Sequence, residues 1–271
     1  MKIENRKITY GKIMSKKQLS DEHCLISLYC PYIANNIMPG QFIQIRLSKH
    51  LTDPLLCRPF AVYRKKGDII DVMFKIVGKG TRLLSEKAVG DDLEITGPLG
   101  NGFPLDEDFE TAMLIAGGMG IAGLFLLAEK MHHKDVIVIL GACSQDKLLG
   151  IDDLNAIGAD VRTTTDDGSC GYKGMVSDRF MDILSEEKHN LAKSKIFSCG
   201  PVPMLKAVAQ IAKENNIPAY VSLEEKMACG IGACMGCACE VVSLDGKPQY
   251  KMVCTDGPVF NAQEVNWILN G

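Results

Sequence analysis

Residues 116–123 read Ala-Gly-Gly-Met-Gly-Ile-Ala-Gly, and this stretch decides the fold of the middle of the chain. An apolar run at 111–116 leads into it, and an apolar run of helical character follows at 124–131. The stretch contains the pattern G-x-G-x-x-G between a strand and a helix, where backbone N–H groups can hold a pyrophosphate. It therefore predicts a dinucleotide-binding turn in a parallel sheet.

Other segments around this turn supply candidate NAD-binding residues. Residues 198–201, Ser-Cys-Gly-Pro, follow an expected strand, and ligands bind at the carboxyl ends of such strands. Cys199 either approaches a nicotinamide ring or is a buried thiol, and the sequence leaves both open. Asp146 could meet a ribose hydroxyl, although a solvated loop residue is the preferred interpretation, as it is for Asp166 and Asp167. The predicted NAD-binding residues are Gly117, Gly118, Gly120, Cys199 and Gly200.

The two ends of the chain have different patterns. Short apolar runs such as 69–77, separated by turns rich in Gly, Pro and Asp, predict a small antiparallel barrel with a short helix at 81–88. Alternating strands and helices in the middle predict a parallel sheet, and the tail at 264–269 is expected to add one or two helical turns. The predicted fold is a β barrel plus α/β, with domains at 1–104, 105–222 and 223–271.

Two segments of the expected barrel have the residue types that bind phosphate. Residues 58–61 read Arg-Pro-Phe-Ala; Arg58 can pair with a pyrophosphate as a planar fork, and Ala61 leaves room for a ring. Taken alone, this segment is more simply an edge strand with a solvated arginine. Residues 78–81, Gly-Lys-Gly-Thr, stand between a strand and a helix, where free N–H groups form an anion site. Together the two segments favour FAD.

The cysteines crowd near the C-terminus. Eleven of the 271 residues are cysteine, and five fall between Cys229 and Cys254. Four of them have the spacing C-x4-C-x2-C-x16-C, which is typical of the plant-type [2Fe–2S] cluster. A structural zinc site would prefer two C-x2-C pairs, and only one such pair exists here. Cys239 is interpreted as a packing residue, and the predicted ligands are Cys229, Cys234, Cys237 and Cys254.

Composition narrows the remaining function classes. The net charge of −3 gives no support for a nucleic-acid surface, and 46% hydrophobic with 23% charged residues is ordinary for a soluble globular protein. No apolar run reaches the roughly 18 residues of a membrane span. The first ten residues lack the apolar core of a signal peptide, so we expect a cytoplasmic protein.

In chain order these pieces resemble the ferredoxin–NADP reductase superfamily. Over essentially its whole length the chain is similar to the electron-transfer subunits of class 1B dihydroorotate dehydrogenase, with the telling stretches at 97–102, 224–234 and 256–260. The family's flavin strand often has a hydroxyl residue where this chain has Ala61. The resemblance implies FAD-binding roles for Arg58, Pro59, Phe60, Ala61, Met73, Phe74, Lys75, Gly80 and Thr81, and cluster ligation by the four cysteines named above.

The resemblance also implies a pathway. A partner subunit would hold FMN and oxidise dihydroorotate to orotate in pyrimidine (UMP) biosynthesis, and electrons would pass from FMN through the [2Fe–2S] cluster and FAD to NAD. Two copies of each subunit would form a heterotetramer, with no nucleic acid or membrane involved. The loop around Met235 is expected to face the partner, because an electron must cross between the two subunits there. No catalytic residue is assigned beyond Cys199.

Three other interpretations remain. The small subunit of an NADH-dependent ferredoxin–NADP oxidoreductase or of a sulfide dehydrogenase has the same architecture. Those subunits tend to carry aspartate at the first cluster position and a different flavin strand, so Cys229 and the Arg58-Pro59 pair argue against them. A redox-sensing module would need an output domain, which the sequence does not show. A self-contained reductase for a ferredoxin or an oxygenase is the third.

Overall fold

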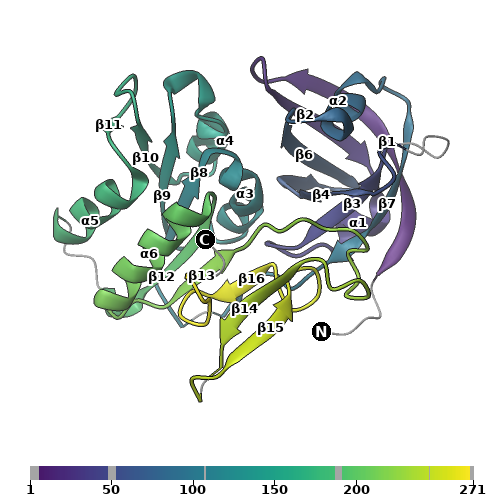
Figure 1. The fold of residues 1–271 in the computed structure, drawn as a ribbon. Coiled ribbons are helices and arrows are strands. Elements are labelled where there is room, and N and C mark those ends of the chain that lie inside the picture. Colours follow the sequence, from purple (N-terminus) through teal and green to yellow (C-terminus); the bar gives the residue numbers. More distant parts are fainter. Residues whose placement is uncertain (1–5, 48–52, 107, 187–190, 244, 269–271) are drawn as a thin grey trace.

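The computed structural model describes residues 6–47, 53–106, 108–186, 191–243 and 245–268. Figure 1 shows a curved antiparallel sheet beside an α/β body, with a small two-stranded sheet next to both. The predicted barrel and parallel sheet are therefore confirmed. In the part of the chain that is described, no helix is long and apolar enough to cross a membrane.

The first sheet is built from the N-terminal part of the chain. Its strands pair antiparallel in the order β4-β3-β7-β1-β2-β6-β5. Alternate side chains of β2, Cys24, Ile26 and Leu28, are fully buried, as expected for a strand with one face on a core. The strands are β1 (Lys7–Gln18), β2 (His23–Tyr29), β3 (Phe42–Arg46), β4 (Arg58–Ala61), β5 (Arg64–Lys66), β6 (Ile69–Lys75) and β7 (Asp92–Leu99).

Two short helices close this sheet, α1 (Pro31–Asn36) and α2 (Lys79–Glu86). The second is the helix expected at 81–88, and it begins two residues earlier than expected. The reason is its cap: the Thr81 hydroxyl accepts hydrogen bonds from the backbone N–H groups of Val77 (3.0 Å) and Gly78 (3.2 Å). Side-chain acceptors of this kind satisfy the free N–H groups of a helix start.

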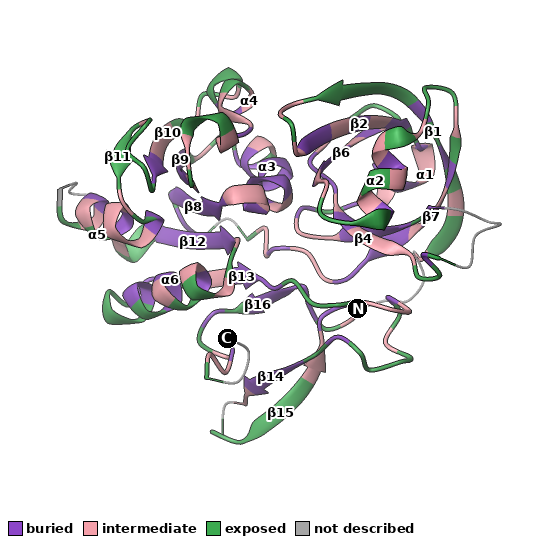
Figure 2. Ribbon diagram, turned by 45° about the horizontal axis from the view of Figure 1, so that its top comes forward, coloured by how far each residue is buried: buried purple, intermediate pink, exposed green. Residues whose placement is uncertain are grey.

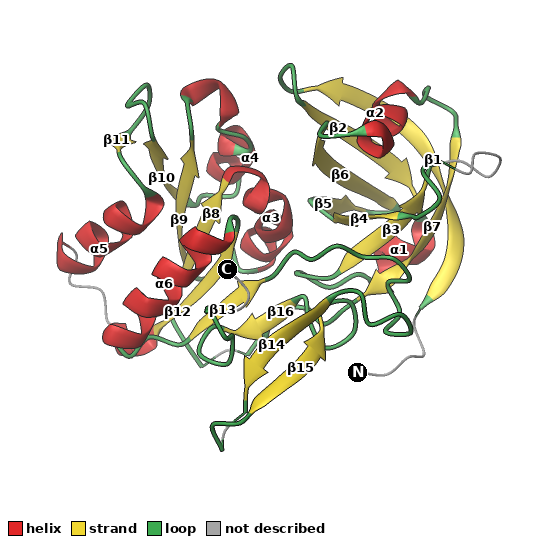
Figure 3. Cartoon of the chain, viewed as in Figure 1, coloured by secondary structure: helices red, strands yellow, loops and turns green. Residues whose placement is uncertain are grey.

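The second sheet has the order β11-β10-β9-β8-β12-β13-β16, parallel except for β16. The chain moves outward on one side of β8 and returns to its other side at β12, so the order reverses between these two strands. β8 is buried at every residue, because helices cover both faces of the sheet (Figures 2 and 3). The strands are β8 (Thr111–Gly117), β9 (Asp135–Ala142), β10 (Asp160–Thr165), β11 (Tyr172–Lys173), β12 (Ser194–Cys199), β13 (Ala219–Ser222) and β16 (Val259–Asn261).

Two separate apolar cores lie on the two faces of this sheet. The first includes residues of α3 and α4, and the second includes residues of α5 and α6. The helices are α3 (Ile121–Lys130), α4 (Ile151–Ala156), α5 (Val176–Glu186) and α6 (Val202–Glu214). Short 3-10 turns at Gly118–Gly120, Gln145–Lys147 and Leu191–Lys193 precede α3, α4 and β12.

The C-terminal part adds a hairpin, β14 (Ala238–Val242) with β15 (Pro248–Met252), before β16 completes the second sheet. The helical turns expected at 264–269 are wrong for residues 264–268, and residue 269 lies outside the described residues. The tail instead runs beside β14: the Val242 N–H donates to the Glu264 carbonyl (2.6 Å), and the Asn266 N–H donates to the Glu240 carbonyl (3.1 Å). These bonds use the backbone groups that a helix would need.

Candidate functional site

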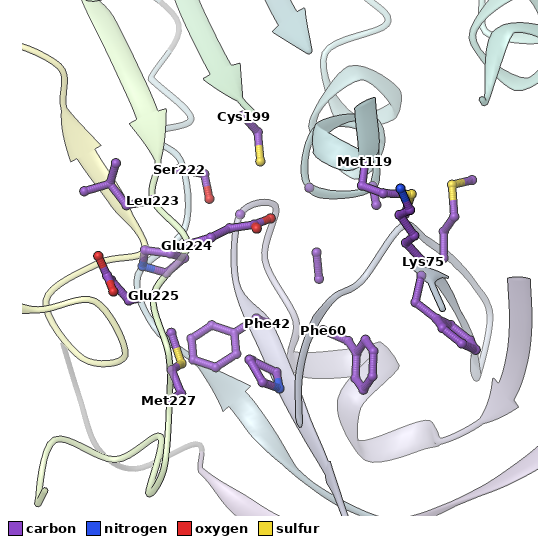
Figure 4. A pocket seen from close by; sticks show the side chains of 18 of the residues that line it. Phe42, Phe60, Lys75, Met119, Cys199, Ser222, Leu223, Glu224, Glu225 and Met227 are labelled. Atoms are coloured by element: carbon purple, nitrogen blue, oxygen red, sulfur yellow. The ribbon is translucent and has the colours of Figure 1, made fainter. Parts of the chain in front are cut away.

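A cavity of about 460 Å³ lies between the curved sheet, the α/β body and the segment that leads to the cysteines (Figure 4). Cys199 and Met119 reach it from the α/β body, and Glu224 and Met227 from the segment opposite. Its floor comes from β4 and β6, and the predicted FAD residues that line it are Pro59, Phe60, Ala61, Met73, Phe74 and Lys75.

The two phosphate-binding segments predicted from the sequence meet at one end of the sheet. A Cβ on Gly80 would lie 2.9 Å from Leu47 Cδ1 and 3.0 Å from Arg58 Nε, so the start of α2 packs closely against the Arg58 side chain. Arg58 itself is held by the Leu56 carbonyl, which accepts a bond of 2.8 Å from Nη1. An apolar cavity with a guanidinium and a helix start beside the same strands fits a flavin dinucleotide.

Thr81 has a second use that the sequence analysis did not assign. Its hydroxyl caps α2 and also donates 3.1 Å to the Gly78 carbonyl. Hydrogen bonding by the Thr81 hydroxyl to a phosphate stays a prediction, and it would require giving up part of this cap. The backbone N–H groups at the start of α2 are the alternative donors.

A second cavity, of about 540 Å³, lies at the carboxyl edge of the parallel sheet. Gly117 and Gly118 line it after β8, and Pro201 and Met204 line it after β12. It therefore stands where the strand order reverses, the usual place for a nucleotide in such sheets. Lys75 and Met119 line both cavities, so the two are neighbours.

The remaining predicted NAD residues support the turns rather than line this second cavity. A Cβ on Gly120 would lie 1.9 Å from the Cys199 carbonyl oxygen, and one on Gly200 would lie 2.9 Å from the Gly117 nitrogen. The glycines after β8 and β12 therefore let the two turns pack against each other. Cys199 is buried and part of the flavin cavity wall, which agrees with a buried thiol, and its approach to a nicotinamide ring stays a prediction. Burial, helped by the Glu224 carboxylate, raises the pKa of this thiol to about 12.

The acidic residue at the nucleotide cavity is not the one that the motif spacing favours. Asp146 and Asp166 are both exposed; Asp146 accepts a hydrogen bond from the Ser144 hydroxyl, and Asp166 lines the cavity. Asp166 follows β10, which pairs with β9 along its length. The signal that could have located it is the end of a strand, but β10 reads Asp-Val-Arg-Thr-Thr-Thr and has too few apolar residues to be recognised.

The four predicted cluster ligands form two thiol pairs. Cys229 and Cys234 interact with each other, as do Cys237 and Cys254, and all four are free of disulfides. Burial would raise the pKa of Cys229, but N–H groups of Ile231 (3.5 Å) and Cys234 (3.4 Å) donate to its sulfur, and the pKa falls to about 7.

This donor set fits a two-iron cluster. Two pairs of thiols match a centre with two irons, each held by two cysteines. Cys239 is separate: it is buried and its sulfur donates 3.5 Å to the Lys251 carbonyl, which agrees with a packing role.

The cysteine loop is fixed against the flavin side of the curved sheet. Gly230 has φ +68°, and a Cβ there would lie 2.6 Å from the side chain of the buried Gln44 on β3. The Gln44 amide also contacts the Ala228 carbonyl at 3.5 Å. Met227, two residues before Cys229, lines the flavin cavity. On its outer side the loop exposes 49% of Ile231 and 64% of Met235.

Comparison with known proteins also divides the chain into an NAD-binding segment and a cluster-binding segment. Residues 114–210 match the family model "Oxidoreductase NAD-binding domain", and residues 224–266 match "Iron-sulfur cluster binding domain of dihydroorotate dehydrogenase B". The chain is 40% identical over 255 residues to "Dihydroorotate dehydrogenase B (NAD(+)), electron transfer subunit" of Caldanaerobacter subterraneus subsp. tengcongensis, covering 94% of this chain and 97% of the relative.

The chain belongs to this family of electron transfer subunits. The subunit of the same name from Geobacillus thermodenitrificans is 36% identical over 260 residues, covering 93% of this chain and 96% of that one. Among solved structures, that of an NADH-dependent reduced ferredoxin–NADP oxidoreductase superposes with a TM-score of 0.84 at 31% identity, covering 96% of this chain and 90% of its own.

Proposed function

We propose that this chain is the electron-transfer subunit of an NAD-dependent dihydroorotate dehydrogenase in pyrimidine biosynthesis. Electrons pass from the FMN of a catalytic partner subunit through a [2Fe–2S] cluster and FAD to NAD. The observation that carries this proposal is that the flavin cavity shares lining residues with the nucleotide cavity and adjoins the cysteine loop. The flavin cavity shares Lys75 and Met119 with the nucleotide cavity, and Met227 joins it to the cysteine loop.

Each side chain has one task in this scheme. The cluster is held by Cys229, Cys234, Cys237 and Cys254. Backbone N–H groups that donate to the Cys229 sulfur help to tune the reduction potential of the cluster. Residues of β4 and β6 hold the flavin ring, with Arg58 and the start of α2 at the pyrophosphate. FAD is the group that converts between one-electron and two-electron transfer.

Met119 lines both cavities, and the neutral Cys199 thiol lines the flavin cavity. They exclude water from the place where nicotinamide and flavin would meet. A dry site prevents loss of reducing equivalents to solvent.

The domain limits that we propose are 1–104 for FAD, 105–222 for NAD and 223–271 for the cluster. The cluster segment contributes β16 to the second sheet, which supports a fixed arrangement of the cluster and nucleotide sites. A heterotetramer with two copies of each subunit, in the cytoplasm, completes the proposal.

One alternative has a specific observation in its favour. The fold matches the NADH-dependent ferredoxin–NADP oxidoreductase at a TM-score of 0.84. The electron donor would then be a reduced ferredoxin rather than dihydroorotate. Cys229, rather than an aspartate, at the first ligand position supports the dihydroorotate assignment.

The test is to purify this chain under native conditions from its own cells together with whatever binds it. We expect an FMN-containing partner and reduction of NAD that depends on dihydroorotate. Spectra of FAD and an iron–sulfur cluster without any response to dihydroorotate would overturn the dihydroorotate assignment and favour the ferredoxin-linked alternative.

A further inference from the structure

A buried amide of the curved sheet, Gln44, lies under the loop that carries the first predicted cluster ligand. Gln44 is 3% exposed and stands in the middle of β3. The same strand forms part of the flavin site: Phe42 lines the flavin cavity, and so does Pro59, which pairs with Gln44 across β3 and β4. Gln44 itself is not among the residues that line the flavin or the nucleotide cavity. This strand therefore meets the flavin site and the cysteine loop at different residues.

The Gln44 amide contacts the backbone on both sides of Cys229. A Cβ on Gly230 would lie 2.6 Å from Gln44 Cδ and 2.7 Å from both Nε2 and Oε1, so the flat face of the amide packs against the Gly230 backbone. Gln44 Nε2 also lies 3.5 Å from the Ala228 carbonyl oxygen. One side chain of the flavin sheet thus holds both chain neighbours of this cysteine.

A second amide holds the chain beside the last predicted ligand. Asn101 follows β7, and its Nδ2 donates to the carbonyls of Thr255 (3.1 Å) and Asp256 (2.8 Å). Thr255 comes directly after Cys254. Since β7 pairs with β3, the two amides come from neighbouring parts of the curved sheet. Cys229 and Cys254 belong to different thiol pairs, so one amide holds each pair to the sheet.

We infer that Gln44 and Asn101 are positioning residues that fix the cluster relative to the flavin, and that electron transfer between the two groups depends on them. This inference rests on the proposed FAD and cluster sites. The rate of electron transfer falls steeply as the distance between donor and acceptor grows, so the cysteine segment must not move against the flavin sheet. Amides suit this task because they bind backbone groups without adding a charge beside the cluster.

The test follows a single reduction by NADH of the isolated chain, loaded with FAD and the cluster. Stopped-flow absorbance separates reduction of FAD from the later reduction of the cluster. Gln44→Met keeps the length of the side chain and loses the amide, and Asn101→Leu does the same at the second contact. Each variant should reduce FAD at the parent rate, because neither residue lines a cavity. Each should reduce the cluster about ten-fold more slowly, because a small misplacement of reacting groups is costly.

Pulsed EPR of the partly reduced chain gives a second readout, the distance between the unpaired electrons of the flavin and of the cluster. This distance should be longer or more widely distributed in Gln44→Met and Asn101→Leu than in the parent. A residue that only stabilised the fold would leave it unchanged. If a variant loses iron, Gln44→Asn and Asn101→Gln replace it, since they keep the amide and change only its reach. They should slow cluster reduction in the same way.

Gln263→Met is the matched control. Gln263 Nε2 donates 3.0 Å to the Ala209 carbonyl, so it also joins distant parts of the chain through an amide, but it connects the C-terminal segment to α6 rather than to the curved sheet. Both reduction steps should keep their parent rates. Cluster reduction at the parent rate in the Gln44 and Asn101 variants would overturn the inference, as would equal slowing of both steps or of the control. A parent chain that holds no FAD or cluster, or whose FAD is not reduced by NADH, would instead contradict the proposed function.

Discussion

The Tyr63 hydroxyl donates a hydrogen bond of 2.7 Å to Asp153 Oδ2, and this contact joins the curved sheet to α4 of the α/β body. Arg64 binds the other oxygen of the same carboxylate at 2.9 Å. The Tyr63 ring is fully buried and lies 4.5 Å from the ring of Phe125 on α3. Burial, together with Asp153, raises the pKa of Tyr63 far above its usual value, so the donor keeps its proton. The curved sheet and the α/β body, which both line the nucleotide site, are thus held together by hydrogen-bonded polar groups surrounded by apolar packing.

Removing this donor should loosen the joint. Tyr63→Phe keeps the ring and its packing but leaves Asp153 Oδ2 without its buried partner. We expect a loss of about 1 kcal/mol in the free energy of unfolding, because part of Asp153 remains open to water. Urea denaturation of the FAD-loaded chain measures it. Tyr29→Phe, at a tyrosine of the same sheet that is 46% exposed, is the control. Equal stability of the parent and Tyr63→Phe would mean that the bond contributes nothing.

The cysteines near the C-terminus offer a matched pair of substitutions. Cys237→Ser should lose the visible absorption of the cluster and its iron, because it removes one of two thiols from a pair. Cys239→Ser changes a buried thiol that bonds the Lys251 carbonyl, and should keep the full iron content with at most a small loss of stability. Iron analysis and absorption spectra of both proteins decide the assignment. Loss of the cluster in Cys239→Ser alone would show that Cys239 is the cluster ligand and Cys237 the packing residue.

The features predicted from the sequence are those that local chemistry determines. The glycine turn at Gly118 and Gly120 follows an apolar strand and needs no distant partner to be recognised. Long-range contacts could not be predicted: Glu22 and Lys147 are 125 positions apart, and nothing in either neighbourhood points to the other. β10 is not recognisable because its second half is a run of three threonines. Asp166 is exposed, as predicted, and it also lines the nucleotide cavity. The prediction of helical turns in the tail is wrong because the tail's backbone forms hydrogen bonds with β14 rather than within a helix.

His23 should give the fold a distinct dependence on pH. Its ring is 4% exposed, and its Nδ1 lies 2.7 Å from the Ser20 hydroxyl. Burial, with Lys75 second, lowers its pKa below the ordinary value of 6.5. As the pH falls below 6.5, the unfolded chain takes up a proton first, so stability is lost until the pH passes the folded-state pKa.

The substitution that tests this dependence is His23→Gln. The variant should lose less stability than the parent when the pH is lowered through 6.5, although it is less stable at neutral pH. Urea midpoints on both sides of that pH measure the difference. His132→Gln removes an exposed histidine and should follow the parent at every pH. A parent-like slope in His23→Gln would assign the acid sensitivity to other groups.

Met235 should mark the face through which electrons enter from the partner. It is 64% exposed, has φ +57° and stands between the ligands Cys234 and Cys237. Met235→Glu places a charge at the centre of this face, and burying an unpaired charge against a partner is costly. We expect reduction of NAD by dihydroorotate in the complex to fall about ten-fold. Reduction of the bound FAD by NADH in the isolated chain should stay unchanged, because the nucleotide and flavin cavities do not include this residue.

The control for Met235→Glu must separate docking from damage to the cluster. Met181→Glu introduces the same charge at a methionine of α5 that is 49% exposed, and both reactions should keep their parent rates. The visible spectrum of Met235→Glu must match that of the parent, which shows that the neighbouring thiols still hold their irons. With the cluster intact, a selective loss of the dihydroorotate reaction places the partner on this loop. An equal loss of both reactions would instead mean that Met235 acts inside the chain, on the path between the cluster and FAD.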